Sequence, residues 1–285
     1  MTIQGLPAQP APGAAPAGSR RRWLVAVTAA WAVLLVGLAL YAVGRGGATV
    51  RTQTTIGQAL PTVDRAVAEV AAAATDAGAV AEIDGYREVS ARCTITAIRD
   101  GARYERAVHL YVPAGQEPAL LDRIRAALPR DYGAQVRRTG NHELSADAGD
   151  FVAVRGGVAG TGEVRIAADT GCRPLTGPVT EAQPPSVAAN RLPGQAVLTT
   201  LNVTDVHWQT HRVPCERGGS IWTVQADGPP ASVPASLADA LRPAAPDAIL
   251  ARPDLYVYRS GPVGVVARAR DGAVTVTATT GCGVQ

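Results

Sequence analysis

The most strongly apolar stretch of the chain lies near its N-terminus. Between Trp23 and Val43 the residues are apolar apart from Thr28, Gly37 and Tyr41. In a helix, about 21 residues rise about 31 Å, which matches the thickness of the hydrocarbon core of a bilayer. The pattern therefore predicts a transmembrane helix over residues 23–43, with the lipid bilayer as its partner.

The residues beside this segment predict its orientation. A triplet of arginines directly precedes it, whereas Arg45 and Arg51 follow it separately. Clustered positive charge stays on the cytoplasmic side, so we expect a cytoplasmic N-terminus and an extracytoplasmic C-terminal region. Aromatic residues favour membrane interfaces, and one lies near each end of the segment. The predicted membrane-flanking residues are Arg20, Arg21, Arg22, Trp23 and Tyr41.

Residues 1–22 are predicted to form a disordered cytoplasmic tail, because most of them are Pro, Ala, Gly or polar and offer little apolar surface to bury. A cleaved signal peptide is an alternative interpretation, but the apolar run is longer than a signal peptide's and no good cleavage site follows it. The stretch Ser19–Leu24 also resembles a twin-arginine signal. Both alternatives leave the C-terminal region outside the cytoplasm.

Beyond this segment, residues 44–61 have the composition of a flexible tether, and residues 62–78 are predicted to form a juxtamembrane helix. Apolar residues recur at i, i+4, i+7 and i+11 from Val63 to Ala74, which places them on one helical face. This stripe either packs on the domain that follows or pairs with a second copy of the chain.

The C-terminal region contains an internal repeat. Two stretches, 163–172 and 273–282, alternate apolar with polar or small residues and both end in Thr-Gly-Cys. Alternation with a period of two is typical of a half-buried strand. Alignment of the two cysteines superposes Val164 on Val274, Ile166 on Val276 and Ala168 on Ala278.

The similarity continues upstream, where each copy has a cysteine-containing segment, a strand, a helix that begins with proline, and two further strands. The predicted order in each copy is β-β-α-β-β-β, which indicates an α+β fold with an antiparallel sheet and one helix on a face. The elements of copy one are the Cys93 segment, 104–112, helix 117–128, 134–139 and 151–158. Those of copy two are the Cys215 segment, 220–226, helix 233–241, 254–259 and 263–270.

This order divides the outer region into repeat 1 over residues 86–172 and repeat 2 over residues 198–285. Residues 173–197 contain five prolines and no sustained periodicity. They are therefore predicted to be a proline-rich linker between the repeats.

The cysteines predict two disulfides. Four cysteines allow three pairings. A duplicated unit that once existed singly had only its own pair to use, so we expect Cys93 to bond Cys172 and Cys215 to bond Cys282. Disulfides persist outside the reducing cytosol, in agreement with the predicted topology.

Composition narrows the class of protein. The chain is 47% hydrophobic and only 4% aromatic, and all its basic residues other than histidine are arginine. Enrichment in Ala, Gly, Pro and Arg resembles proteins from bacterial genomes of high GC content. The net charge of +3 and the absence of a basic run outside the membrane flank argue against nucleic acid as a partner.

Few residues are candidates for chemistry. His207 and His211 share a face of a strand or helix, but Trp208 stands where a metalloprotease needs glutamate. The valines around them favour a strand with ordinary surface or cross-strand histidines. His109 is predicted to be a structural residue of another strand.

Two polar or flexible stretches also have structural explanations. Residues 141–150 contain His142, Glu143, Asp147 and Asp150 without the spacing of a calcium loop, so a solvated hairpin loop is expected. The glycine-rich stretch 156–163 lacks the Gly-Lys-Ser/Thr ending of a phosphate-binding loop and predicts a hairpin turn.

We therefore predict no catalytic residue, metal ligand or cofactor. The expected function is that of a single-pass, membrane-anchored extracytoplasmic binding, sensory or scaffolding protein of a bacterial cell envelope. Its partner would be an unknown envelope protein or polymer. One alternative is an extracytoplasmic hydrolase of envelope material that uses His207, His211 and the loop with Asp147 and Asp150. Another is an accessory subunit of a membrane complex.

Overall fold

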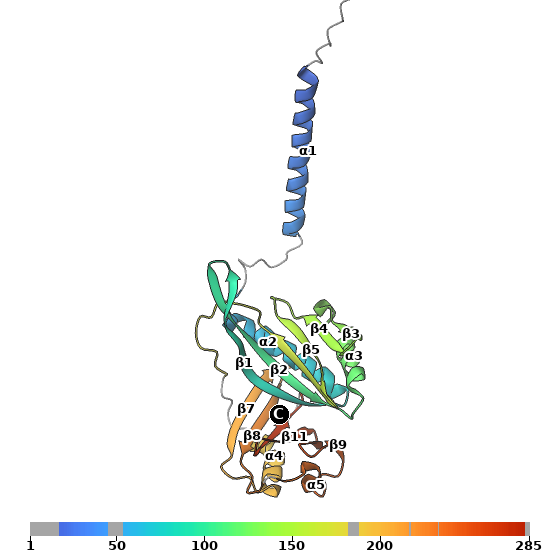
Figure 1. Ribbon diagram of the computed structural model, residues 1–285, viewed down its shortest axis with the longest axis vertical. Helices are drawn as coiled ribbons and strands as arrows, with labels where there is room; N and C mark the ends of the chain where they lie inside the picture. The colour runs from blue at the N-terminus through green and yellow to red at the C-terminus, as the bar shows by residue number, and fades with distance from the viewer. Residues whose placement is uncertain (1–16, 45–53, 182–187, 217, 233, 283–285) are drawn as a thin grey trace, which may run out of the picture. The chain divides into compact units, whose positions relative to one another are not determined.

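The computed structural model describes residues 17–44, 54–181, 188–216, 218–232 and 234–282. Helix α1 (Ala17–Gly44) belongs to one unit, and all the other helices and strands belong to a second, compact unit. Figure 1 shows the two sheets of the second unit and the helices beside them.

Helix α1 extends beyond the predicted apolar segment at its N-terminal end. Among its described side chains, the large apolar ones that are exposed range from Leu34 at 53% to Val33 at 72%. In the part of the chain that the structure describes, no helix has the length and apolar character needed to cross a membrane. Residues 17–22 are helical and so do not belong to the disordered tail predicted over residues 1–22, because arginine is a good helix former. The predicted roles of Arg20, Arg21 and Tyr41 concern side chains outside the described ones.

Sheet 1 has six antiparallel strands in the order β1-β2-β6-β5-β4-β3. The long β1–β2 hairpin extends past β6, because β6 pairs only with residues 105–111 of β2. The strands are β1 (Val80–Thr96), β2 (Arg99–Tyr111), β3 (Gln135–Arg137), β4 (Glu143–Asp147), β5 (Ala153–Gly160) and β6 (Glu163–Asp169).

Sheet 2 repeats this arrangement with six strands in the order β7-β8-β12-β11-β10-β9. Each strand occupies the place of its counterpart in sheet 1, which fits the internal repeat and the predicted α+β class. The strands are β7 (His207–Pro214), β8 (Ser220–Gly228), β9 (Ala248–Ala251), β10 (Leu255–Ser260), β11 (Val263–Arg270) and β12 (Ala273–Thr279).

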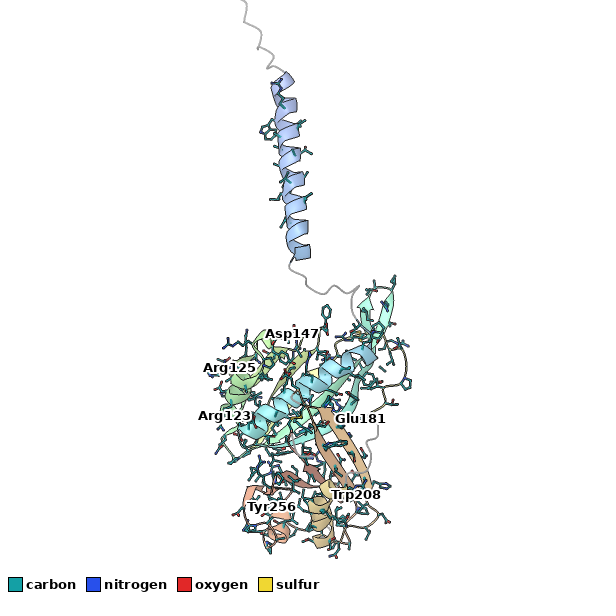
Figure 2. All side chains as sticks on the ribbon, turned by 180° about the vertical axis from the view of Figure 1, so that it is seen from behind. Arg123, Arg125, Asp147, Glu181, Trp208 and Tyr256 are labelled. Atoms are coloured by element: carbon teal, nitrogen blue, oxygen red, sulfur yellow. A yellow bond between two sulfur atoms is a disulfide. The ribbon has the colours of Figure 1, made fainter. Side chains whose placement is uncertain are left out.

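Two helices cover one face of each sheet. Helices α2 (Ile56–Asp76) and α3 (Glu117–Ala127) pack on sheet 1, and a 3₁₀ turn, Arg130–Tyr132, follows α3. Helices α4 (Ala188–Thr200) and α5 (Leu237–Leu241) pack on sheet 2. The view in Figure 2 shows α2 lying across its sheet.

The predicted strand order, β-β-α-β-β-β, lacked one strand in each copy. In repeat 1 the missing strand is β4, which lies inside the stretch predicted to be a solvated hairpin loop. Its Leu144 is buried while Ser145 is exposed, but five residues with acidic ends do not make a clear pattern. In repeat 2 the missing strand is β9, whose sequence Ala-Ile-Leu-Ala does not alternate.

The helix that begins each repeat was also predicted incorrectly: the start of α2 was placed too late, and α4 was not predicted at all. Helix α2 starts at Ile56, inside the predicted tether 44–61, because the Gln58 side chain accepts a hydrogen bond from the Thr55 N–H at 3.0 Å and caps the first turn. Helix α4 starts inside the predicted linker 173–197 and tolerates Pro193. Each copy is therefore α-β-β-α-β-β-β-β, with two helices rather than one on its sheet.

The predicted apolar stripe of α2 packs on its own domain, as one of the two interpretations expected. Val63, Val67, Val70 and Ala74 are all at most 2% exposed and contact the buried side of sheet 1. Burial of this stripe on strands β1, β2 and β6 fixes the helix to the sheet.

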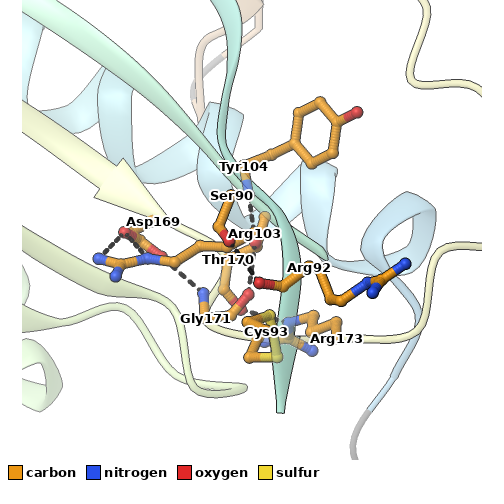
Figure 3. Close-up of a disulfide and its surroundings, with 10 residues drawn as sticks. Ser90, Arg92, Cys93, Arg103, Tyr104, Asp169, Thr170, Gly171 and Arg173 are labelled. Atoms are coloured by element: carbon orange, nitrogen blue, oxygen red, sulfur yellow. Dashed lines mark hydrogen bonds and ion pairs between the residues drawn. A yellow bond between two sulfur atoms is a disulfide. The ribbon is translucent and has the colours of Figure 1, made fainter. Parts of the chain in front are cut away.

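Both predicted disulfides are confirmed. Cys93 bonds Cys172 and Cys215 bonds Cys282, with Cα–Cα distances of 5.9 and 6.0 Å. Cys93 lies in β1 and Cys172 follows β6, so the first bond joins two strands that flank β2 (Figure 3). It holds the part of the β1–β2 hairpin that extends past the sheet.

The two repeats pack with the edge strand of one on the face of the other. Strand β1 crosses the helix-free face of sheet 2, where Val80 packs with Val257 and Val266. A Cβ at Gly264 would lie 2.8 Å from Val80 Cγ1, so glycine is needed for this close approach. The Ile83 N–H also donates to Thr223 Oγ1 at 3.1 Å.

Candidate functional site

The helix-free face of sheet 1 presents polar side chains. Helices α2 and α3 both lie on the opposite face, where Val108 and Ile166 are buried. On the helix-free face, Ala167 of β6, Arg155 of β5 and Ser145 of β4 are successive cross-strand partners. Since side chains alternate between the two faces of a strand, Arg155 rises between two small residues.

Two hollows adjoin on this face. One of about 930 Å³ lies over strands β3 to β6, and one of about 530 Å³ reaches the Cys93–Cys172 disulfide. Both are lined by Arg155 and Arg165, so we treat them as one site and name it the arginine trough. Its charged lining residues, apart from His142, are Arg103, Glu105, Arg137, Glu143, Arg155, Arg165 and Asp169.

Three of the four trough arginines are paired with carboxylates that also line the trough. Arg103 Nε donates to Asp169 Oδ2 at 2.6 Å beside the disulfide (Figure 3). Each of the three carboxylates is therefore neutralised by a guanidinium. The pairs are Arg103–Asp169, Arg165–Glu105 and Arg137–Glu143.

Arg155 is the exception among these four arginines. Its side chain is exposed and makes no hydrogen bond or ion pair with any residue that the structure describes. Arg165 lies diagonally across the strand pair from it, because Arg155 pairs in register with Ala167. Such diagonal neighbours lie about 7–8 Å apart. The trough thus presents one cation without a counter-ion beside a second cation.

Comparison of the two repeats shows that sheet 2 has no such polar lining at the positions equivalent to Arg155 and Ser145. By strand register, Arg155 occupies the place of Val266, and Ser145 occupies the place of Val257. Both valines are at most 2% exposed, because β1 covers them. The helix-free face of sheet 2 is thus buried by packing against repeat 1, whereas the equivalent face of sheet 1 is charged and hollowed.

A second polar cluster lies where the repeats meet, and we name it the Arg106 cluster. Arg106 is 1% exposed, and its guanidinium binds Asp64 Oδ1 at 2.8 Å and the carboxylate of Glu181. Tyr86 donates to Asp64 Oδ1 at 2.6 Å, and His211 Nδ1 lies 2.8 Å from Glu181 Oε2. The cluster joins α2, β1, β2 and β7 to the segment between the repeats, where Glu181 lies (labelled in Figure 2).

Charge pairing governs protonation in this cluster. Burial raises the pKa of the Glu181 carboxyl, but the hydrogen bond with His211 and the charge of Arg106 outweigh burial and lower it overall. For Arg106, burial lowers the pKa and the charges of Glu181 and Asp64 raise it further than burial lowers it. Both groups are therefore held in their charged forms.

The structure places the predicted histidines apart from the trough lining, except His142. His207 is exposed on β7, and His211 joins the Arg106 cluster from the same strand. His109 lies in β2, as predicted, 3.1 Å from Asp84. Among the described residues, no group of three or more His, Cys, Asp or Glu side chains could hold a metal ion.

The acidic stretch 141–150 does not join those histidines. Glu143 and Asp147 belong to β4, and Asp147 Oδ1 accepts a hydrogen bond from the Gly149 N–H at 2.9 Å. No hydrogen bond or ion pair within the described chain links Asp147 or Asp150 to His207 or His211. The glycine-rich stretch forms the β5–β6 hairpin, as predicted.

The sequence interpretation did not identify the trough arginines or the members of the Arg106 cluster other than His211. One signal was present, because alignment of the cysteines places Arg165 on Thr275 and Asp169 on Thr279. These are charged residues in one copy and neutral residues in the other. Glu181 had no such signal, since it lies between the copies.

Comparison with known proteins gives little further information. No family model matches the chain, and no curated protein matches it. One similar solved structure is the crystal structure of a DUF4853 family protein from Actinomyces odontolyticus ATCC 17982. It is 13% identical, the match covers 60% of this chain and 93% of that chain, and the TM-score is 0.31. Similarity at this level carries no argument about function.

Proposed function

We propose that this chain is a membrane-anchored, extracytoplasmic binding protein of a bacterial cell envelope, and that the arginine trough is its binding surface. The observation that carries the proposal is the difference between the two repeats. The face that is filled by packing in sheet 2 is hollowed in sheet 1. There, at the position of a buried valine, stands Arg155, which has no partner among the residues that the structure describes. Pockets with a few convergent polar groups are the usual sites of ligand binding.

Two features support the membrane anchor and the outer location. Large apolar side chains of α1 are exposed, and an arginine triplet precedes the segment predicted to span the bilayer, residues 23–43. The second unit contains two disulfides and no free cysteine among its described residues. Disulfides of this kind are typical of compartments outside the cytosol.

A non-enzymatic role is favoured over hydrolysis. A general acid or base must be free to exchange a proton with its substrate. The trough carboxylates Glu105, Glu143 and Asp169 are each bound to an arginine that also lines the trough, so none of the three is free of a protein partner. The histidine nearest to acidic partners, His211, lies in the Arg106 cluster and contacts Glu181 rather than a hydroxyl or thiol nucleophile.

The proposal is tested by site-specific photo-crosslinking in intact cells. A benzophenone amino acid at Ser145, in the trough, should form adducts with an envelope component that resist boiling in detergent. The same group at Arg125, an exposed residue of α3 on the opposite side of the sheet (labelled in Figure 2), should not. Equal adducts at both positions, or none at Ser145 in protein correctly located at the membrane, would contradict the proposal.

A further inference from the structure

We infer that the arginine trough is a site for an oxyanion-bearing ligand, carboxylate or phosphate, and that Arg155 is its anchoring residue. The inference rests on the proposed function in one respect, because both assume that the helix-free face of sheet 1 is the binding surface. It adds the chemical class of the ligand and the residue that selects it.

Charge in the trough determines the class of ligand. Four arginines and three carboxylates line it, and each carboxylate is bound by a different arginine. The remaining arginine, Arg155, has its fork of N–H donors free of partners in the described chain. A planar guanidinium binds carboxylate or phosphate through two parallel hydrogen bonds, so an anion satisfies donors that a neutral ligand does not.

The shape of the trough gives that ligand room to approach. The cross-strand neighbours of Arg155 are Ala167 and Ser145, and Gly157 lies beside Arg165 in register. A side chain could not be added at Gly157 without a shift, because its Cβ would lie 3.3 Å from Glu143 Cα and closer still to the His142 carbonyl oxygen. The small residues around Arg155 and Arg165 thus leave space above the sheet in which an anion can reach both guanidinium groups.

Arg165 adds a second positive charge to the same anion. It binds Glu105, which also accepts from Arg87 Nε at 3.1 Å. Because Glu105 keeps Arg87 as a partner, Arg165 can share its remaining N–H donors with a ligand without leaving that carboxylate unpaired. Arg155 is therefore the anchor and Arg165 an auxiliary donor.

The test is calorimetric titration of the full chain in non-ionic detergent with inorganic tripolyphosphate and, separately, with a ten-residue polyglutamate peptide. A ten-residue polyglutamine peptide is the neutral probe. At least one anion should bind the wild type, and the neutral peptide should not. Stronger binding of tripolyphosphate would identify phosphate as the source of the oxyanion, and stronger binding of polyglutamate would identify carboxylate.

Substitutions then locate the site. Arg155→Gln should weaken anion binding about tenfold or more, as expected for loss of a charge-assisted pair of hydrogen bonds. Arg155→Lys should give an intermediate loss, because it keeps the charge but not the fork. Arg125→Gln makes the same charge change on α3 and should leave binding unaltered within about twofold.

The outcomes are separable. Equal weakening by Arg155→Gln and Arg125→Gln, or no binding of either anion by folded wild-type protein, would overturn the inference. If photo-crosslinks form at Ser145 while neither anion binds, the binding surface stands and only the ligand class fails. Thermal unfolding of each variant confirms that binding is compared between folded proteins.

Discussion

At the scale of single residues, the chain uses arginine in two different ways. Arg106 is buried between two carboxylates where the repeats meet, whereas Arg155 is exposed and has no counter-ion in the described part of the chain. A buried guanidinium needs paired charges to offset its lost hydration, and an exposed one remains available for a ligand. The same residue type therefore holds the repeats together at one site and, in the function proposed above, recognises a ligand at the other.

The lowered pKa of Glu181 predicts a defined pH dependence of stability. A carboxyl whose pKa is lower in the folded state stabilises the protein above its unfolded pKa, about 4.5, and this contribution is lost as the pH falls through the folded pKa. The titratable and charged side chains of the cluster around it are Arg106, His211 and Asp64, with the phenol of Tyr86 on the far side of Asp64. Acidification below about pH 4.5 should therefore loosen the contact between the repeats.

The measurement is denaturant unfolding of wild type and Glu181→Gln between pH 7 and pH 3. The variant should be less stable at pH 7, and the difference in free energy of unfolding should shrink as the pH falls. Glu216→Gln, at an exposed glutamate after β7, is the matched control and should differ by less than about 0.5 kcal/mol. A constant difference for Glu181→Gln across the range would contradict the ionic role of Glu181.

At the scale of elements, the disulfides and the tight turns decide which strands stay in place. The turn between β5 and β6 contains Gly162, whose φ of +75° favours glycine. A Cβ there would lie 2.7 Å from Leu250 Cδ1 of β9 and 2.8 Å from the Val112 carbonyl oxygen. This turn is thus in close contact with β9, an edge strand of sheet 2.

Gly162→Ala should therefore destabilise the protein by more than backbone strain alone. Gly115→Ala is the control, since Gly115 has a φ of +86° but no atom within 4 Å of an added Cβ. Strain at such a φ costs about 1 kcal/mol, and Gly162→Ala should exceed the control by about another 1 kcal/mol in thermal or denaturant unfolding. Equal costs would mean that the turn can move away from β9 freely.

The disulfides make a separate prediction. Their closed loops span 79 and 67 positions, and chain entropy alone gives each bond on the order of 4 kcal/mol, with native strain often reducing it. The double variant Cys93→Ala with Cys172→Ala should destabilise repeat 1 more than repeat 2. Hydrogen exchange should rise first in residues 88–104, the part of the β1–β2 hairpin beyond β6.

The matching variant, Cys215→Ala with Cys282→Ala, is the control for that experiment. It should raise exchange near β7 and β12 and leave residues 88–104 protected. If both double variants raised exchange in the same residues, the two repeats would unfold as one unit, and the assignment of each bond to its own copy's stability would be wrong.

At the scale of the whole molecule, the proposed topology gives opposite accessibility on the two sides of α1. Gly57 is exposed near the start of α2, and an added Cβ meets no atom within 4 Å, so Gly57→Cys is a tolerant probe position. A membrane-impermeant thiol reagent should label Gly57→Cys in intact cells. It should label Ala14→Cys only after permeabilisation, and the reverse pattern would exclude the proposed orientation.

The sequence alone determined the features that depend on local residue patterns or on the pairing of four cysteines between two repeats. Alternation before the two Thr-Gly-Cys endings indicated the last strand of each copy, and the internal repeat by itself selected both disulfides from the three possible pairings. The helix 117–128 and the strand 263–270 were placed within one residue, because each has a clear period or boundary. Short elements such as β4 and β9 have too few residues to show a period.

Only the tertiary structure decided which face of which sheet is free. The helix-free faces of the two sheets occupy equivalent places in the two copies, yet β1 covers the face of sheet 2 and leaves that of sheet 1 hollowed. The sequence around Arg155 or Val266 does not indicate this difference. Val266 is buried by β1, a strand more than 100 positions away in the sequence. Likewise Asp64, Arg106 and Glu181 meet only because α2, β2 and the segment between the repeats converge in the fold. Packing between residues far apart in the sequence creates these contacts, and the local pattern of apolar and polar residues does not encode such packing.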